Sequence, residues 1–326
     1  MTLTVTQEGF NEIWTDWESL LSECAKPTVF ETPLWHRAWW DEEEDGQTEL
    51  RLMAIRDNGT LVGVAPMMCR DDTLMSLGDP DLWDYQTFVT AYGREAELYQ
   101  VLFDYLVEQP WHKMELSSLP EGSPSLDLIP EMARSNGYSV DVSDQDVSPG
   151  LPLPSSWDDY MTGLSKKGRH ELRRKFRRLE NNGTYEVYSV NGELSLNGSL
   201  DDFFRMMRES RQDKAIFLTP KREQFFRHMA EEMARADVLR LFFMEVSGER
   251  VASAMCFDYR QVRFLYNAGY NPEYAPLSVG LLLKTTCLQQ AIEQDMDYFD
   301  FLRGDERYKY ELGAKVVRVH RLVVQR

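Results

Sequence analysis

The chain of 326 residues carries 54 acidic and 36 basic side chains, for a formal net charge of −18. Its length predicts about two domains, and its 43% hydrophobic content is typical of a folded globular protein. Four well-separated cysteines and five histidines without metal-binding spacing argue against a disulfide framework and predict no metal site. So acidic a chain is a poor DNA-binding protein, because the phosphate backbone repels it.

No apolar stretch approaches the ~20 residues that a membrane-spanning helix needs. The N-terminal MTLTVTQEGF lacks the basic segment and apolar core of a secretory signal. We therefore expect no transmembrane segment and a cytoplasmic location. The sequence leaves the oligomeric state open.

Helical and strand periodicities follow the same order in the two halves of the chain. Residues 147–156, VSPGLPLPSS, contain three prolines and a glycine, and they predict a boundary between domains 1–150 and 151–326. The first half predicts strand 3–7, helices 10–21 and 32–39, strands 50–55, 60–68 and 73–77, helix 95–108, strand 114–119, helix 126–135 and strand 138–143.

The second half repeats that order after an additional helix at its entry. Each half reads β-α-α-β-β-β-α-β-α-β, which predicts an α+β fold with a mixed sheet flanked by helices. The second half predicts helix 166–179, strand 184–190, helices 199–211 and 219–236, strands 238–246, 249–259 and 261–270, helix 278–295, strand 296–302, a short segment at 306–314 and strand 316–324.

The entry helix concentrates positive charge. Residues 166–178, KKGRHELRRKFRR, contain eight Lys or Arg and one Glu, so they carry +7 and leave −25 on the rest of the chain. Leu172, Phe176 and Leu179 share one helical face. The pattern fits a surface helix docked by this apolar face. It also fits a helix that recruits an anionic ligand, because clustered arginines bind phosphate.

Two stretches of the second half combine residues that suit chemistry. After strand 261–270, a proline-rich loop leads to residues 278–280 (Ser-Val-Gly) at a helix start, where backbone N–H groups can bind a pyrophosphate. A simple capped helix start explains the same residues. Strand 296–302 runs into a segment that can supply a base, a phenolic acid and a cation, although a polar loop with an ion pair has the same composition. That segment holds Asp305, Glu306, Tyr308, Lys309 and Tyr310.

These stretches belong to one longer pattern. It consists of YNAGY (266–270), the turn at 278–280, FDFLRGD (299–305) and residues 308–309 (Tyr-Lys). It extends to the entry helix and, in the first half, to VFETPLWHRAWW, LVGVAPM and Asp84-Tyr85. In these residues nearly the whole chain resembles the GNAT-like acyltransferases of the CelD/FemAB type. The resemblance implies tandem GNAT-like folds, with a degenerate first copy on the acceptor side and the acyl-donor site in the second.

The resemblance also implies a site for acetyl-CoA or another acyl-CoA as co-substrate. The donor pantetheine would follow strand 263–270, and its pyrophosphate would lie at the start of the next helix. The glycine-rich loop of the family is abbreviated here, since only Gly280 is present. The implied donor-binding residues are Tyr266, Asn267, Ala268, Gly269, Tyr270, Ser278, Val279, Gly280 and Leu281.

The implied reaction is direct attack of an amine on the thioester. Asp305 is the candidate base, with Asp300 in reserve, and Tyr308, favoured over Tyr310, protonates the leaving thiolate. Lys309 would stabilise negative charge near the acyl group. We expect a small-molecule or glycan-precursor amine as the acceptor, with an amino sugar as our hypothesis. The implied acceptor-binding residues are Asp84, Tyr85, Arg169, Asp300 and Arg303.

Two other interpretations stay open at the level of sequence. A FemAB-type aminoacyltransferase would take its acyl group from aminoacyl-tRNA, and the basic helix favours it. The charge of −25 elsewhere disfavours tRNA as a partner, as does the lack of room for a helical-hairpin insertion. Two degenerate GNAT-like folds could also form a binding protein without catalytic activity.

Overall fold

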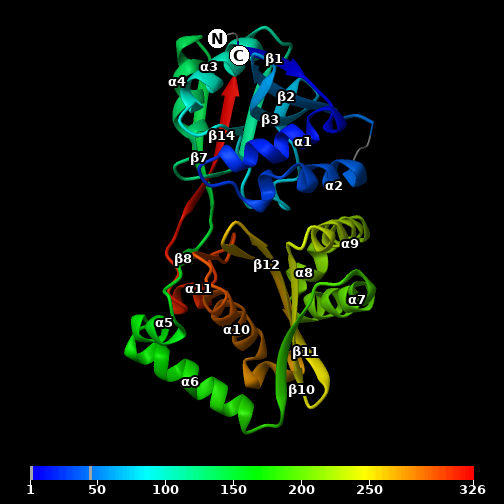
Figure 1. Cartoon of the computed structure of the whole chain (residues 1–326), viewed down its shortest axis with the longest axis vertical. Coiled ribbons are helices and arrows are strands. Elements are labelled where there is room, and N and C mark those ends of the chain that lie inside the picture. The colour runs from blue at the N-terminus through cyan, green and yellow to red at the C-terminus, as the bar shows by residue number, and fades with distance from the viewer. Residues whose placement is uncertain (1–2, 44–45) are drawn as a thin grey trace. The chain divides into compact units, whose positions relative to one another are not determined.

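The chain forms two compact units, each with its own sheet (Figure 1). The structure, a computed structural model, describes residues 3–43 and 46–326. Unit 1 comprises Met1–Val147 and Val317–Arg326, and unit 2 comprises Ser148–Val316. The predicted boundary between residues 150 and 151 differs by a few residues, and the last ten residues return to unit 1 instead of completing the second domain.

Unit 1 is a mixed sheet covered by helices. Its strands follow the order β1-β2-β3-β4-β6-β14-β7, and β5 pairs with β3. All of its strand pairs are antiparallel except β4 and β6. The elements of unit 1 are β1 (Leu3–Gln7), α1 (Phe10–Leu20), η1 (Leu21–Glu23), η2 (Val29–Glu31), α2 (Pro33–Glu43), β2 (Glu49–Asp57), β3 (Thr60–Arg70), β4 (Thr73–Ser76), β5 (Val89–Thr90), α3 (Glu95–Val107), β6 (Lys113–Pro120), α4 (Pro124–Ser135), β7 (Ser139–Val147) and β14 (Arg318–Gln325).

Unit 2 repeats this architecture. Its sheet has the order β8-β13-β12-β11-β10-β9, and only β12 and β13 are parallel. The elements of unit 2 are β8 (Gly150–Pro152), α5 (Trp157–Gly163), α6 (Lys166–Glu180), β9 (Tyr185–Val190), α7 (Glu193–Ser210), α8 (Gln212–Phe217), α9 (Pro220–Arg235), β10 (Leu239–Val246), β11 (Glu249–Tyr259), β12 (Val262–Tyr270), η3 (Pro272–Leu277), α10 (Val279–Glu293), β13 (Tyr298–Asp300) and α11 (Arg307–Glu311).

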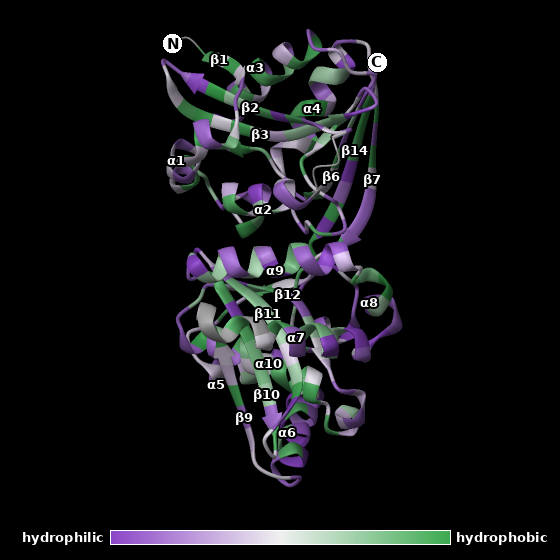
Figure 2. Ribbon diagram, turned by 90° about the vertical axis from the view of Figure 1, so that its right-hand side faces the viewer, coloured by the Kyte–Doolittle hydropathy of each residue, from purple (hydrophilic) through white to green (hydrophobic). Residues whose placement is uncertain are grey.

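Helices cover both faces of the sheet in unit 2. Helix α10 lies on one face together with α5 and α6, whereas α7, α8 and α9 lie on the other (Figure 1). The central strands β10 and β11 are hydrophobic because both of their faces are buried, whereas α6 is hydrophilic over most of its surface (Figure 2). Among residues 3–43 and 46–326, no helix is long and apolar enough to cross a membrane.

The α+β fold and the repeated order of elements confirm the prediction, but the last strand changes place. Strand β14 pairs with β6 and β7 in the sheet of unit 1, not with the sheet of unit 2. In unit 2, the short strand β8 takes the position beside β13. The side chains of Val319, Leu322 and Val324 are buried; Leu322 and Val324 alternate as in a half-buried strand, and a register shift near His320 separates them from Val319. That alternation predicts a strand without naming its neighbours, which is why the sequence assigned β14 to the wrong sheet.

A buried cation ties the start of β12 to α10. The Arg263 side chain is fully buried and donates two hydrogen bonds of 2.7 Å to the carboxylate of Asp258. It also donates to the backbone carbonyl of Cys287 at 2.9 Å and to Oε1 of Gln294 at 2.8 Å. Arg263 therefore holds the strand against the helix and has a structural role at the beginning of the implied donor strand.

Candidate functional site

The site of unit 2 opens where two parallel strands diverge. Strand β13 pairs with β12 only through residues 262–264, although β12 continues to Tyr270. The register of β12 against β11 shifts between Met255 and Cys256, which places a β-bulge at Tyr266. The edge of β12 at residues 265–270 is consequently not covered by β13, and it forms one wall of a cavity of about 340 Å³.

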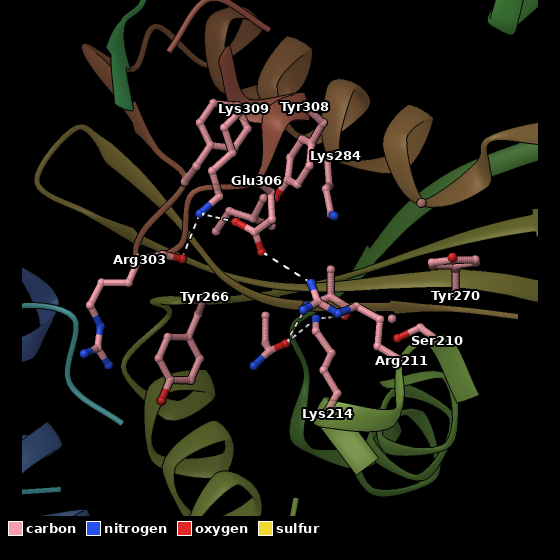
Figure 3. A pocket seen from close by; sticks show the side chains of 16 residues that line it. Ser210, Arg211, Lys214, Tyr266, Tyr270, Lys284, Arg303, Glu306, Tyr308 and Lys309 are labelled. Atoms are coloured by element: carbon pink, nitrogen blue, oxygen red, sulfur yellow. Dashed lines mark hydrogen bonds and ion pairs between the residues drawn. The ribbon is translucent and has the colours of Figure 1, made fainter. Parts of the chain in front are cut away.

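Four parts of unit 2 contribute side chains to this cavity, which we call the donor cavity (Figure 3). They are the junction of α7 and α8, strand β12, helix α10, and the segment from the end of β13 into α11. The residues that line the donor cavity are Ser210, Arg211, Lys214, Leu265, Tyr266, Asn267, Ala268, Gly269, Tyr270, Gly280, Lys284, Phe301, Arg303, Glu306, Tyr308 and Lys309.

Gly269 brings helix α7 to the cavity. A Cβ atom at this position would lie within 3.0 Å of backbone atoms of Met206 and Met207, so the helix packs directly on the glycine. This close approach places Ser210 and Arg211, at the end of α7, on the cavity wall. The packing of α7 therefore explains the absence of a side chain at Gly269.

We expect Gly269→Ala to lower the free energy of unfolding by about 1–3 kcal/mol, because the new methyl group must displace the α7 backbone. Gly198→Ala is the matched control, since Gly198 is exposed on the same helix and a Cβ there meets nothing within 4 Å. The control should gain about 0.5–1 kcal/mol from the helix preference of Ala over Gly. Urea unfolding curves measure both, and changes of the same sign would contradict this account of Gly269.

Lys214 is held against the donor strand. Its Nζ donates to Oδ1 of Asn267 at 2.8 Å and to the backbone carbonyl of Ala268 at 2.5 Å. Burial and the neighbouring Lys284 and Arg211 lower the pKa of Lys214 to about 7. The Lys214 amine therefore changes its charge close to neutral pH.

Lys284 and Tyr308 face each other at the centre of the cavity. The Lys284 ammonium lies 4.1 Å from the centroid of the Tyr308 ring, and burial lowers the pKa of Lys284 to about 8. Tyr308 also packs edge to face against Phe301. Burial, and then the Glu306 carboxylate, raises the pKa of Tyr308 well above its usual value, so its hydroxyl stays protonated. Among the described residues this hydroxyl has no hydrogen-bond partner, which leaves it available to a ligand.

Glu306 and Lys309 form an ion pair that shapes the loop after β13. Glu306 Oε2 lies 2.9 Å from Lys309 Nζ, and although burial opposes it, this ammonium lowers the pKa of Glu306. The buried Lys309 also donates to the backbone carbonyls of Leu302, Arg303 and Gly304 at 2.8–2.9 Å. These contacts use every N–H of Lys309. Lys309 thus fixes the loop, and its predicted role near the acyl group stays a prediction.

The predicted donor-binding residues divide into two groups. Residues 266–270 and Gly280 line the donor cavity, whereas Ser278, Val279 and Leu281 do not. Ser278 precedes α10 in the left-handed conformation with φ of 60°, and its side chain makes no capping hydrogen bond. Its Oγ instead accepts a hydrogen bond from Lys175 of α6 at 3.0 Å. Val279 is buried, and Leu281 faces a second cavity of about 360 Å³ between α6, α10 and α11.

The carboxylates proposed as bases lie outside the donor cavity. Asp305 is exposed, and its Oδ1 accepts a hydrogen bond from the Tyr310 hydroxyl at 2.5 Å. Asp300 is buried and accepts from the backbone N–H of Leu302 at 2.8 Å, which shapes the turn after β13. Glu306 is the carboxylate that lines the cavity. Loop position could not distinguish it from the adjacent Asp305, because both follow the turn at Gly304 (φ of 114°).

The predicted acceptor-binding residues lie in different places. Arg303 lines the donor cavity, whereas the Arg169 side chain donates to backbone carbonyls of Met161 and Thr162 at 3.0 Å and joins α6 to α5. Asp84 and Tyr85 are buried in unit 1. Tyr85 lines a cavity of about 470 Å³ there. Within unit 2, Arg303 and Arg169 therefore have different surroundings, and only Arg303 lines the donor cavity.

The basic helix α6 contacts the segment that precedes α10. Besides the Lys175 bond to Ser278, Arg178 donates to the backbone carbonyl of Pro276 at 2.9 Å. Leu172 and Leu179 are buried, as the apolar face predicted. Six of the eight Lys and Arg side chains of residues 166–178 remain exposed, so the structure supports both the docked helix and a charged outer surface.

Sequence reasoning missed Ser210, Arg211, Lys214 and Lys284, and it included Glu306 in the candidate segment without choosing it as the base. The first three follow an amphipathic helix in a segment with no recognisable motif. Lys284 was detectable, because it lies one helical turn after Gly280 and so shares its face of α10. No group of three or more His, Cys, Asp or Glu side chains in the described part of the chain could hold a metal ion.

A comparison with known protein families finds a match over part of the sequence. The model of the acetyltransferase (GNAT) domain family matches residues 166–310, which span α6 to α11. Residues 166–310 are thus similar to an acetyltransferase (GNAT) domain. The matched range contains every residue that lines the donor cavity. A search of curated proteins found no match.

Solved structures show that the whole chain shares a tandem GNAT-like fold of the FemAB type. FemX is similar with a TM-score of 0.66 at 10% identity, covering 98% of this chain and 96% of FemX. L-PGS from Bacillus licheniformis has a TM-score of 0.57 at 12% identity, and the alignment covers 95% of this chain and 90% of L-PGS. A tandem GNAT protein from the clavulanic acid biosynthesis pathway has a TM-score of 0.51 at 13% identity, and the alignment covers 98% of each chain. At these identities the likeness concerns the fold.

Proposed function

We propose that the donor cavity is the active site of an N-acyltransferase that moves an acyl group, acetyl in the simplest case, from acyl-CoA to an amine. The observation that carries this proposal is the edge of β12 that β13 leaves uncovered, together with the Tyr308 hydroxyl, which has no hydrogen-bond partner among the described residues. Residues 265–270 and Tyr308 line the same cavity, and on this edge the Ala268 carbonyl accepts a hydrogen bond from Lys214. Such an edge suits the amide groups of pantetheine, which hydrogen-bond like an added strand.

The phosphates of the donor have a place at the start of α10. The first N–H groups of a helix lack acceptors within the helix and carry partial positive charge. In α10 these groups belong to Val279 and Gly280, since the N–H groups of Leu281 and Leu282 already bond to the carbonyl of Ser278. Gly280 lines the donor cavity, so a pyrophosphate bound there is continuous with a pantetheine along β12.

The cavity residues supply the proton transfers of direct acyl transfer. The acceptor amine, once deprotonated, forms a C–N bond with the thioester carbonyl carbon as the C–S bond breaks. Glu306 replaces Asp305 as the base candidate because it is the carboxylate in the cavity. The Tyr308 hydroxyl protonates the leaving thiolate. Backbone N–H groups near residues 267–269 polarise the thioester carbonyl.

The acceptor in this proposal is a small-molecule or glycan-precursor amine, with an amino sugar as the specific hypothesis. Unit 1 contributes on the acceptor side through its own cavity, which Tyr85 lines. The proposed setting is the cytoplasm, where acyl-CoA and sugar precursors are both available.

Donor binding can be tested by thermal unfolding with acetyl-CoA, longer acyl-CoAs and free CoA. A ligand at about 100 times its Kd stabilises the folded state by about 2.7 kcal/mol, so the melting temperature should rise with concentration. Pantetheine-free adenosine is the negative control. If no CoA species shifts the melting temperature at millimolar concentration, the proposed donor is wrong.

Aminoacyl-tRNA is the second candidate donor, and the six exposed cations of residues 166–178 favour it. Binding through phosphate contacts weakens steeply with salt. Filter binding of bulk aminoacyl-tRNA at low and moderate salt tests this alternative. Salt-sensitive binding that α6 charge reversal removes, together with no effect of CoA, would favour the tRNA donor.

A further inference from the structure

The donor cavity contains more positive charge than its single carboxylate can balance. Five of its lining residues are Lys or Arg and one, Glu306, is acidic. This excess occurs in a chain whose formal net charge is −18. Lys214 lies on α8, Arg211 directly precedes that helix, and Lys284 lies on α10 at the opposite side of the cavity. The three side chains point toward one another (Figure 3). We call Arg211, Lys214 and Lys284 the cationic cluster.

Glu306 is already committed to other cations. It lies 2.9 Å from Lys309 and 3.7 Å from Arg211. Lys214 donates only to the neutral oxygens of Asn267 and Ala268. The Lys284 ammonium donates no hydrogen bond to any described residue and rests on the Tyr308 ring. Two lysines of the cluster thus lack a carboxylate partner in the cavity.

The charged groups around the two lysines explain their lowered pKa values. Besides burial, Lys214 faces Lys284 and Arg211, which disfavour its charge, and Glu306 and Asp213, which favour it. Burial, Lys309 and Arg211 lower the pKa of Lys284, whereas Glu306 and Cys287 raise it. A bound anion would favour the protonated form of each lysine, so it would raise both pKa values.

We propose that the cationic cluster binds a carboxylate or phosphate group that a substrate carries close to its reacting centre. This anion is distinct from the donor pyrophosphate, which is placed at Val279 and Gly280. Lys284 lies one helical turn further along α10 and contacts the Tyr308 ring, which puts the cluster at the thioester end of the cavity. Assigning the anion to a substrate rests on the proposed function, whereas the anion site itself does not.

Two substrates could supply such an anion. The acyl group of the donor could end in a carboxylate, as in a dicarboxylic acyl-CoA, or the acceptor amine could carry a carboxylate or phosphate. Both place a negative charge within reach of the cationic cluster, and both would make charge-assisted hydrogen bonds to its lysines. The experiment therefore separates the existence of the site from the source of the anion.

Calorimetric titration of the protein without CoA tests the site, with succinate as the probe and succinamide as its neutral match. We expect succinate to bind at least about tenfold more tightly, which is the effect of one charge-assisted hydrogen bond. At pH 8 binding should take up protons, because Lys214 and Lys284 have pKa values of about 7 and 8 and the anion raises both. Titrations in two buffers of different ionisation enthalpy measure that uptake.

Substitutions connect the binding to the cluster. Lys214→Met and Lys284→Met should each weaken succinate binding by about tenfold and reduce the proton uptake, whereas Lys221→Met on the exposed surface of α9 should change neither. Arg211→Gln is the third cluster variant. The Arg211 side chain is about half exposed, so replacing it leaves the buried packing intact. Succinate binding no tighter than succinamide, or unchanged in all three cluster variants, would overturn the proposal.

A matched pair of CoA esters tests whether the donor or the acceptor carries the anion. Succinyl-CoA and butyryl-CoA have acyl chains of equal length and differ in the terminal carboxylate. A preference for succinyl-CoA of about tenfold or more assigns the anion to the donor, whereas equal binding of the two CoA esters assigns it to the acceptor. If neither CoA ester binds but succinate binding depends on the cluster, the proposed function fails while the anion site stands.

Discussion

Replacement of Tyr308 by Phe should lower kcat for acyl transfer by about 10²–10³-fold, the usual contribution of a general acid. The substitution removes only the hydroxyl, so the ring keeps its contacts with Phe301 and Lys284. Donor affinity should therefore stay within about twofold, since the hydroxyl acts on the leaving thiolate and not on the bound ground state. Thiol release in steady state, together with the melting-temperature shift by acetyl-CoA, measures the two quantities.

Tyr310→Phe is the matched control for this experiment. Tyr310 lies two residues away on the same helix, α11, and its hydroxyl donates to the exposed Asp305 outside the cavity. We expect its kcat to remain within about twofold of wild type, as is usual for surface substitutions. Equal turnover of wild type and Tyr308→Phe, with donor binding intact, would remove the acid assignment.

Replacement of Arg263 by Met should lower the free energy of unfolding by about 3–5 kcal/mol, because it leaves the Asp258 carboxylate without its main partner. The guanidinium is fully buried, and it also satisfies the carbonyl of Cys287 and the side chain of Gln294. Arg240 lies 3.2 Å from Asp258 and retains part of its stabilisation, so we expect a loss at the lower end of this range. Urea unfolding monitored by fluorescence and by far-UV circular dichroism measures the change.

Arg205→Met tests the contrast between buried and exposed ion pairs. The Arg205 side chain is 44% exposed on α7, where it pairs with Asp202 and Glu209. Exposed pairs of this kind contribute about 0–1 kcal/mol, so this variant should stay within that range. A loss for Arg263→Met no larger than that for Arg205→Met would show that the buried network does not hold β12 against α10.

The fold was largely predictable because each element has a clear local pattern. Alternating apolar residues predicted the strands of both sheets except the short β5 and β8, and the repeated order of elements predicted two similar α+β units. Strand β14 shows where this reasoning ends. Its buried Val319, Leu322 and Val324 fit either sheet, and pairing with β6 and β7 depends on contacts with residues about 170 to 210 positions away.

The site was predictable only in part, for a similar reason. The stretch from Tyr266 to Tyr270 and Tyr308 were found because they belong to continuous motifs, and the structure places both on the donor cavity. Arg211 and Lys214 reach the same cavity through the packing of α7 on Gly269, which no motif records. Asp305 and Glu306 are neighbours of the same type, and only the path of the chain after Gly304 directs Glu306 to the cavity.

Local residue patterns alone predicted the two α+β units, the strand that forms β12 and the amphipathic basic helix. Each of these depends on periodicity or on residues close together in the chain. Tertiary packing decided which sheet receives β14, that Lys309 stabilises a loop, and that Lys214 and Lys284 meet in one cavity. The net charge of −18 is a property of composition and can be counted from the sequence. A cationic cavity within so acidic a chain forms only when distant segments fold together.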